Sequence, residues 1–169
     1  MPIDPSWTSP PHGLAAIKAT FGDIRVASGK VSPASWESAN MVVVWDFPGL
    51  PPRPDGSPRP LYVNRAIVEP LRAALAACVA LGDGYAIRTI GCFAPRLKRV
   101  NGDLSTHSWG VAIDINADTN PLAAPGVVLA DAVRDMPDAW VEVFQGLGWT
   151  WGGRFPRPDP MHYQFCSGF

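Results

Sequence analysis

Residues 105–114 read Ser-Thr-His-Ser-Trp-Gly-Val-Ala-Ile-Asp, and this stretch decides how the rest of the chain is interpreted. It places His107, one of three histidines, seven residues before Asp114. From Val111 onward, aliphatic residues alternate with alanine, aspartate and asparagine. This alternation predicts a strand that turns Asp114 away from the aliphatic row. A turn at Gly110 would fold His107 back over the same face, so that an imidazole and a carboxylate converge as they do on a metal ion.

A second stretch near the C-terminus supplies the other half of this pattern. Residues 158–165 read Pro-Asp-Pro-Met-His-Tyr-Gln-Phe. In a short strand His162 and Gln164 would share one face, with Tyr163 and Phe165 on the other. The sequence therefore predicts a second histidine on the polar side of a hydrophobic strand.

We predict one zinc ion per chain, held by His107, Asp114 and His162. A single histidine or aspartate near a strand is usually a structural residue. Three such groups facing a core are harder to explain, because each costs about 1–3 kcal/mol unless it is satisfied. One zinc ion satisfies all three, and two histidines with one carboxylate leave a fourth position open, as in catalytic zinc sites.

The two motifs S-x-H-x-x-G-x-A-x-D and D-x-x-H, separated by a helical segment and a Trp-Gly stretch, resemble those of zinc peptidases that cut peptidoglycan stem peptides. This family includes D-alanyl-D-alanine carboxypeptidases of the VanY type and the L-alanyl-D-glutamate endopeptidases of phage endolysins. The resemblance extends from about Gly13 to about Phe165. It implies the same three zinc ligands: His107, Asp114 and His162.

The resemblance also assigns roles to neighbouring residues. Asp159, three residues before His162, matches the catalytic base, although the family more often has glutamate there. Ser105 is expected to contact substrate because the family motif contains a serine. Similar enzymes use an arginine in this region to hold carbonyl or carboxylate groups of the substrate. We expect Arg96 in this role, with Arg88 as the competing candidate.

The implied chemistry is metal-assisted amide hydrolysis, in which Asp159 accepts the water proton and passes it to the leaving amine. A zinc histidine should donate its free ring nitrogen to a neighbouring acceptor, for which Gln164 and Asn116 are candidates. His12 lies in a proline-rich stretch and is not expected to be a ligand. A Ser-His-Asp hydrolase is a rival interpretation, but the sequence has no Gly-x-Ser-x-Gly motif. A relative that binds wall peptide without cutting it is a second rival.

The scissile bond is expected to lie between L-alanine and D-glutamate, as in the endolysin branch, with D-alanyl-D-alanine carboxypeptidase as the alternative. Two long loops at 47–60 and 117–126 would frame a groove open on both sides of the metal. The N-terminus lacks the basic and apolar regions of a signal peptide. We therefore expect synthesis in the cytoplasm and action on the cell wall after release through a holin or another route.

Composition limits the class of protein. The 169 residues, 47% of them hydrophobic, fit one domain. We expect an extended arm at 1–12 and a catalytic domain at 13–169, acting as a monomer. A net charge of −1 gives no electrostatic reason to bind nucleic acid. No run approaches the ~18 apolar residues of a membrane span. The three cysteines have no paired spacing and are expected to be buried.

The fold class expected is α+β: a small, mainly antiparallel sheet that carries the zinc site, with helices packed on one face. Trp149 and Trp151 are assigned equally to the core or to substrate contact. Asp135 is the expected cap of the last helix, with Pro137 in its first turn. Asn64 is the expected cap of the longest helix, which should bend at Pro70 and bury Val79. The expected helices are 14–21, 64–81 and 135–148, and the expected strands are 41–46, 85–90, 111–116 and 162–165.

Overall fold

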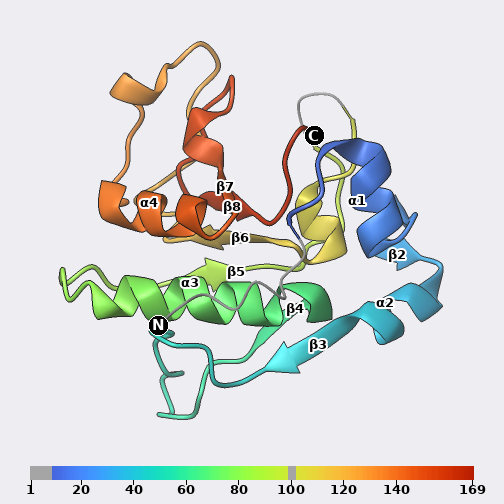
Figure 1. The fold of residues 1–169 in the computed structure, drawn as a ribbon, viewed down its shortest axis with the longest axis horizontal. Coiled ribbons are helices and arrows are strands. Elements are labelled where there is room, and N and C mark those ends of the chain that lie inside the picture. Colours follow the sequence, from blue (N-terminus) through green and yellow to red (C-terminus); the bar gives the residue numbers. More distant parts are fainter. Residues whose placement is uncertain (1–8, 99–101) are drawn as a thin grey trace.

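A four-stranded antiparallel sheet lies at the centre of the protein, whose computed structural model describes residues 9–98 and 102–169 (Figure 1). In this sheet Gly91 lies opposite Asp114, and Asp114 lies opposite His162. Residues paired across antiparallel strands share a face, so the register alone places Asp114 and His162 side by side. The strands, in spatial order, are β5 (Ile90–Gly91), β6 (Ala112–Ile115), β8 (His162–Gln164) and β7 (Thr150–Trp151).

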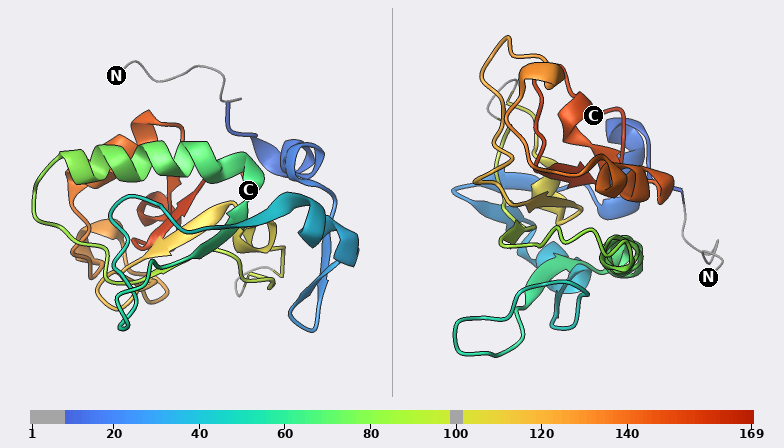
Figure 2. Two further views of the ribbon diagram at one scale, coloured as in Figure 1. Left: turned by 90° about the horizontal axis from the view of Figure 1, so that it is seen from below. Right: turned by 90° about the vertical axis from the view of Figure 1, so that its left-hand side faces the viewer.

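Helices α3 (Val68–Ala80) and α4 (Asp138–Gly146) lie side by side and cover one face of this sheet (Figure 2). Tyr163 of β8 points to this face and stacks on Phe144 of α4, with ring centroids 4.3 Å apart. The α+β fold with helices on one face is therefore confirmed. The opposite face of the sheet remains for the polar residues of β6 and β8.

Two further antiparallel sheets have two strands each: β1 (Arg25–Ala27) pairs with β2 (Lys30–Ser32), and β3 (Met41–Val44) pairs with β4 (Leu61–Asn64) in what we call the second sheet. The chain enters the longest helix from β4 through Asn64, whose side chain accepts a hydrogen bond from the Ala66 N–H, as predicted for a cap. The remaining elements are α1 (Gly13–Phe21), α2 (Ala34–Asn40) and the 3-10 turns η1 (Arg65–Ile67), η2 (Thr106–Trp109), η3 (Leu129–Asp131) and η4 (Gly152–Arg154).

Two of the predicted strands differ from the structure. The strand expected at 85–90 is only β5, because residues before it bond to the side chain of Asn116 instead of to a neighbouring strand. The strand expected at 41–46 ends at Val44 and is only partly buried, since Met41 and Val44 are buried but Val43 is 45% exposed. The N-terminal arm expected at 1–12 lies mostly outside the described residues.

The helix predictions need three corrections. Asp135 does not cap α4; Pro137 is the residue before its first turn, and Asp135 bonds to Tyr85 and Asn120 instead. Val79 of α3 is exposed, because the buried stripe of that helix ends at Cys78. Pro70 lies in the first turn of α3, where a missing N–H breaks no helical hydrogen bond, so the chain needs no bend there.

The aromatic and sulfur-containing side chains confirm two expectations. Trp149 and Trp151 are both buried, so the core assignment holds. The three cysteines are buried and free, and burial raises the pKa of the Cys78 and Cys166 thiols to about 12. Within residues 9–98 and 102–169, no helix combines the length and the apolar character that a membrane crossing requires.

Candidate metal centre

The 3-10 turn η2 carries His107 to the free face of the sheet. Ser105 begins this turn by accepting a hydrogen bond from the His107 N–H at 3.4 Å. Gly110 ends it with a φ of 64°, in the left-handed region that favours glycine. A Cβ at this position would lie 2.5 Å from the Met41 methyl group. The predicted turn at Gly110 is thus confirmed, and Ser105 is buried as its cap, while its contact with substrate stays a prediction.

Three side-chain atoms meet at the centre of that face, and we call His107, Asp114 and His162 the histidine cluster. His107 Nε2 lies 3.1 Å from Asp114 Oδ1 and 3.1 Å from His162 Nδ1, and His162 Nδ1 lies 3.0 Å from Asp114 Oδ1. Ligands bonded to zinc at about 2.0–2.1 Å in a tetrahedron are about 3.3–3.4 Å apart. The triangle therefore has nearly the size of three corners of a zinc site.

Hydrogen bonds fix which nitrogen of His107 carries the proton. His107 Nδ1 lies 2.6 Å from the carbonyl oxygen of Cys92, and a carbonyl can only accept. Nδ1 therefore donates, which leaves a lone pair on Nε2, the atom that faces the cluster. The serines beside His107 do not engage its ring: Ser105 bonds to the main-chain N–H of His107, and Ser108 donates to the Arg96 carbonyl.

A second set of hydrogen bonds fixes which ring nitrogen of His162 carries the proton. The amide nitrogen of Gln164 donates to the Cys166 carbonyl at 3.3 Å, so the amide oxygen faces the other way, toward His162 Nε2 at 3.1 Å. Thr106 also donates to this oxygen. His162 Nε2 therefore donates and Nδ1 presents a lone pair to the cluster. Gln164 is one of the two expected partners of the zinc histidines.

Asn116, the other expected partner, serves a different part of the fold. Its side-chain oxygen accepts from the backbone N–H groups of Arg88 and Thr89, and its nitrogen donates to the Tyr85 hydroxyl. Asn116 has a φ of 48°, which asparagine tolerates better than most residues. It ends β6 and orients the chain before β5, away from the histidines.

The histidine cluster thus brings two nitrogen lone pairs and one carboxylate oxygen together without a proton between them. Two lone pairs 3.1 Å apart repel unless a proton or a metal cation lies between them. Burial raises the pKa of Asp114, but its attraction to the two histidines when an imidazole carries a positive charge outweighs burial, and the net pKa is lowered. Burial lowers the pKa of His162, yet Asp114 and Asp159 outweigh it and the net pKa is raised. The site therefore favours a positive charge at its centre.

Asp159 lies next to this cluster in a tight loop after η4. Its main-chain N–H donates to the Gly152 carbonyl at 2.9 Å, and its carbonyl accepts from the His162 N–H at 3.0 Å. A Cβ on Gly152 would lie 2.7 Å from the Asp159 carbonyl oxygen and 3.0 Å from His162 Cβ. Glycine at position 152 therefore lets the loop close, and the sequence reasoning did not single out this residue.

The Asp159 carboxylate is held with one oxygen unsatisfied. Among the described residues its buried Oδ1 has no hydrogen-bond partner. Burial raises the pKa of this carboxyl group, and the positive charges of the histidines and Arg96 oppose that rise without cancelling it. A desolvated carboxylate with a free lone pair and a raised pKa is suited to accept a proton.

The two candidate arginines have different surroundings. Arg96 is exposed, and its charge acts on Asp159, so it lies within electrostatic reach of the cluster. Ser108 holds the Arg96 main chain by accepting from its N–H and donating to its carbonyl. Arg88 instead forms an ion pair with Asp135 at 3.0 Å. The structure therefore brings Arg96 and not Arg88 toward the site, although contact with substrate stays a prediction.

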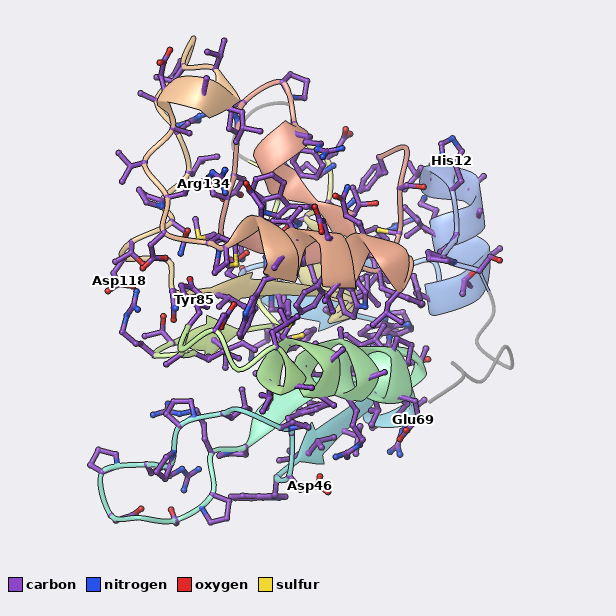
Figure 3. All side chains as sticks on the ribbon, turned by 60° about the vertical axis from the view of Figure 1, so that its left-hand side comes forward. His12, Asp46, Glu69, Tyr85, Asp118 and Arg134 are labelled. Carbon is purple, nitrogen blue, oxygen red and sulfur yellow. The ribbon has the colours of Figure 1, made fainter. Side chains whose placement is uncertain are left out.

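Sequence reasoning missed Thr106 and Phe155 beside the cluster, and it did not predict the contact that Trp151 makes there. Thr106 is buried and donates to the Gln164 amide oxygen, a contact that forms only when η2 folds close to β8. The Phe155 ring lies 5.9 Å from the His162 ring. Trp151 donates from its indole nitrogen to the Pro160 carbonyl at 2.9 Å, which fixes the loop that carries Asp159. His12 bonds to Ser167 and lies beside α1 (Figure 3).

Comparison with known proteins agrees with this geometry. The model of a peptidase family described as D-alanyl-D-alanine carboxypeptidase matches residues 99–165. The matched segment contains the whole histidine cluster and Asp159, but neither candidate arginine. No curated protein and no solved structure matches the chain. The family match, together with a cluster that fits a metal ion, supports a metallopeptidase that acts on peptidoglycan.

Proposed function

We propose that this protein is a zinc-dependent peptidase that hydrolyses an amide bond in peptidoglycan stem peptides. The observation that carries the proposal is the triangle of two imidazole lone pairs and one carboxylate oxygen, with sides of 3.0–3.1 Å. Nitrogen and oxygen ligands in this number suit zinc and leave a fourth position for water or substrate. The family match over residues 99–165 supports a peptidase.

His107, Asp114 and His162 would hold the zinc ion. A bound zinc ion supplies a Lewis acid that polarises the scissile carbonyl and lowers the pKa of a bound water to roughly 7. Cys92 and Gln164 accept hydrogen bonds from the two imidazoles, and so keep the ring nitrogens that face the cluster free of protons. The protein thereby orients its ligands before any metal binds.

Asp159 acts as the general base in this proposal. It accepts a proton from the attacking water and passes it to the leaving amine as the carbon–nitrogen bond breaks. Its unpartnered oxygen leaves room for that proton, and its raised pKa makes the transfer favourable. Arg96 would hold a carbonyl or carboxylate of the substrate, as its exposed position allows.

Within this function we propose cleavage between L-alanine and D-glutamate. An endopeptidase needs a groove open on both sides of the metal. The 117–126 loop supports one wall, because its Ala123 N–H donates to the Pro158 carbonyl and its Asn120 carbonyl accepts from the Met161 N–H, on either side of Asp159. The 47–60 loop extends from β3 and β4 beyond α3 (Figure 1). Release of the protein from the cytoplasm to the wall belongs to the same proposal.

D-alanyl-D-alanine carboxypeptidase is the second candidate, and the description of the matching family favours it. Such an enzyme must bind a free terminal carboxylate, and Arg96 offers a cation for it. The two candidates differ in their products. An endopeptidase creates new amino termini on glutamate, whereas a carboxypeptidase releases free D-alanine.

The test is digestion of purified peptidoglycan by the zinc-loaded protein, with mass spectrometry of the products. Stripping the metal with a chelator should abolish turnover, and adding zinc should restore it. Release of D-alanine alone would reject the endopeptidase and keep the peptidase. A protein that binds wall peptide but cleaves nothing at any zinc concentration would be a binding module, and the proposed function would be wrong.

A further inference from the structure

An uncovered strip of surface begins beside the histidine cluster at Gly91, and we call it the lane. Gly91 lies opposite Asp114 in the β5–β6 register, so both residues belong to the metal face of the sheet. Gly91 is exposed, and a Cβ placed on it would meet none of the described atoms within 4 Å. Cys92 points the other way, since it is buried and its sulfur donates to the Gly110 carbonyl. Phe93, two residues after Gly91, is half-buried.

Phe93 connects this lane to the outer face of the second sheet. Its ring meets the Tyr62 ring edge to face, with centroids 5.4 Å apart. Tyr62 lies opposite Val43 in the β3–β4 register, and Val43 is 45% exposed. Trp45, two residues further along, is 52% exposed. We call Gly91, Phe93, Tyr62, Val43 and Trp45 the outer strip.

The outer strip is not explained by packing within the described chain. The other face of the same two strands buries Val44, Leu61 and Val63 in the core, so this sheet already has its hydrophobic contact. An exposed valine near the end of β3 and an exposed tryptophan just after that strand leave apolar area in water, and neighbouring exposed apolar residues mark binding surfaces more often than isolated ones do. The Arg53 guanidinium lies 5.4 Å from the Trp45 ring centroid and adds a hydrogen-bond donor group at the far end.

We propose that the outer strip binds the glycan strand of peptidoglycan, which rests on the proposed function and extends it. Sugar rings present C–H groups on their faces and hydroxyl groups at their edges, so they suit an aromatic and aliphatic strip that ends at an arginine. The strip is continuous with the metal face through Gly91. In a stem peptide, L-alanine is the residue attached to the glycan, so a glycan on this strip lies close to a bond cut after L-alanine. The terminal D-alanines lie at the opposite end of the peptide.

The first experiment measures binding without catalysis. A linear tetramer of N-acetylglucosamine is added to the zinc-loaded protein, and the indole signals are followed by nuclear magnetic resonance. The Trp45 signal is assigned from its absence in Trp45→Phe. We expect this signal to shift with the saccharide while the signals of Trp149 and Trp151, both buried, stay in place. An unchanged Trp45 signal at millimolar saccharide would overturn the proposal.

The second experiment compares two substrates for one set of variants: polymeric peptidoglycan and a free stem peptide without glycan. Trp45→Ala should raise KM about tenfold on the polymer, equivalent to about 1.4 kcal/mol, and change it less than about twofold on the free peptide. Trp45→Phe should keep most of the affinity because it keeps a ring. Val133→Ala is the matched control, since Val133 is 68% exposed and lies outside the strip.

Gly91→Leu adds a separate readout, because its side chain would enter the lane and block passage from the cluster to the strip. It should weaken binding of the saccharide less than it weakens turnover of the polymer. If Trp45→Ala raised KM equally on the polymer and on the free peptide, the outer strip would bind the peptide, and the glycan proposal would be overturned. If the unmodified protein cleaves neither substrate, the proposed function fails, while the saccharide titration still decides the strip.

Discussion

The sheet carries two polar clusters, and they satisfy their hydrogen bonds in opposite ways. In the histidine cluster, two imidazole nitrogens and the Asp114 carboxylate face one another with acceptors only. Just past the C-terminal end of β6 lies a second cluster, which we call the amide cluster: Tyr85, Arg88, Asn116, Asn120 and Asp135. In that cluster each acceptor meets a donor.

Asn120 shows how completely the amide cluster is closed. Its side-chain oxygen accepts from the N–H groups of Asp135 and Met136, and its nitrogen donates to the Asp135 carboxylate and the Asn116 carbonyl. Figure 3 shows Tyr85 and Asp118 at this edge of the molecule. A cluster that satisfies itself stabilises the fold. A cluster of acceptors that face one another at 3.0–3.1 Å is suited to bind a cation, so the comparison separates structure from function without reference to any relative.

The largest effect should follow removal of a ligand from the histidine cluster. His107→Ala is expected to lose tightly bound zinc and nearly all peptidase activity, because a two-ligand site cannot hold the ion in competition with water. Elemental analysis gives the zinc content and circular dichroism checks the fold. His12→Ala is the matched control, since His12 bonds to Ser167 and should change neither property. A full equivalent of zinc at the same site in His107→Ala would contradict the assignment.

The next effect concerns Asp159. Asp159→Asn should keep zinc and lose about 10²–10⁴ in rate, the usual range for general acid–base catalysis. Near-normal turnover would transfer the role of base to another group. Asp159→Glu tests the length of the side chain, because the family more often has glutamate here. Higher activity in that variant would show that the shorter aspartate limits the reaction.

The same residue gives a pH dependence with a definite sign. The pKa of Asp159 is raised in the folded protein, so folding favours its protonated form, and ionisation costs stability as the pH rises past the unfolded value of 3.8. In the metal-free protein Asp159→Asn should therefore melt above the unmodified protein at pH 7. The difference should disappear in acid, where both side chains are neutral. A lower melting temperature for the variant at pH 7 would contradict the raised pKa.

A smaller effect should follow from loss of the group that orients His162. Gln164→Ala removes the acceptor for His162 Nε2, and such partners usually contribute about 10–100-fold to metal affinity. Competition with a fluorescent zinc chelator measures the change. Gln145→Ala, on the half-buried side of α4, is the control. Unchanged zinc affinity in Gln164→Ala would mean that Cys92 and the ligand triangle suffice.

The sequence predicts a feature of the fold or the site when the residues that form it are close together in the chain. The alternation around Asp114 and the glycine at position 110 are local signals, and they predicted the strand, the turn and the convergence on His107. The amide cluster is non-local: Asp135 was predicted to cap a helix because it precedes one, but it is recruited by Asn120 and Tyr85, which no local pattern indicates. For the same reason Tyr85 and its neighbours were predicted as a strand.

The closed loop at Asp159 shows the same limit inside the site. Pro158 and Pro160 flank Asp159 in the sequence and restrict the backbone on both sides of it. The close approach of Gly152 to Asp159 and His162 depends on how η4 folds against β8, so an ordinary-looking glycine carried no signal. Thr106 was equally hidden, since its bond to Gln164 joins residues from two distant motifs.

Arg96 lies toward the histidine cluster and Arg88 belongs to the amide cluster. Replacing each arginine by alanine therefore compares the two clusters with the same substitution. Arg96→Ala should raise KM roughly tenfold, since it removes a charged donor to the substrate, and should leave folding unchanged. Arg88→Ala should leave KM unchanged and lower stability, because it opens the amide cluster. Steady-state kinetics and urea denaturation of both variants give the two readouts. A KM effect for Arg88→Ala alone would exchange the two assignments.

The smallest effect should come from the charge of the amide cluster itself, and its sign separates that cluster from Asp159. Burial raises the pKa of Asp135, but hydrogen bonds from Tyr85, Thr119, Asn120 and Arg88 outweigh it and lower the pKa. The carboxylate therefore stabilises the fold above the unfolded value of 3.8, and this contribution is lost as the pH falls through the folded pKa. Because the pair with Arg88 is partly exposed, its contribution should stay below about 1 kcal/mol and fall with added salt. Urea denaturation of Asp135→Asn at pH 7 and at pH 3 measures it, with Asp138→Asn as the control for a neighbouring exposed carboxylate. A variant that is less stable by the same amount at both pH values would show that the shape of the side chain matters here and its charge does not.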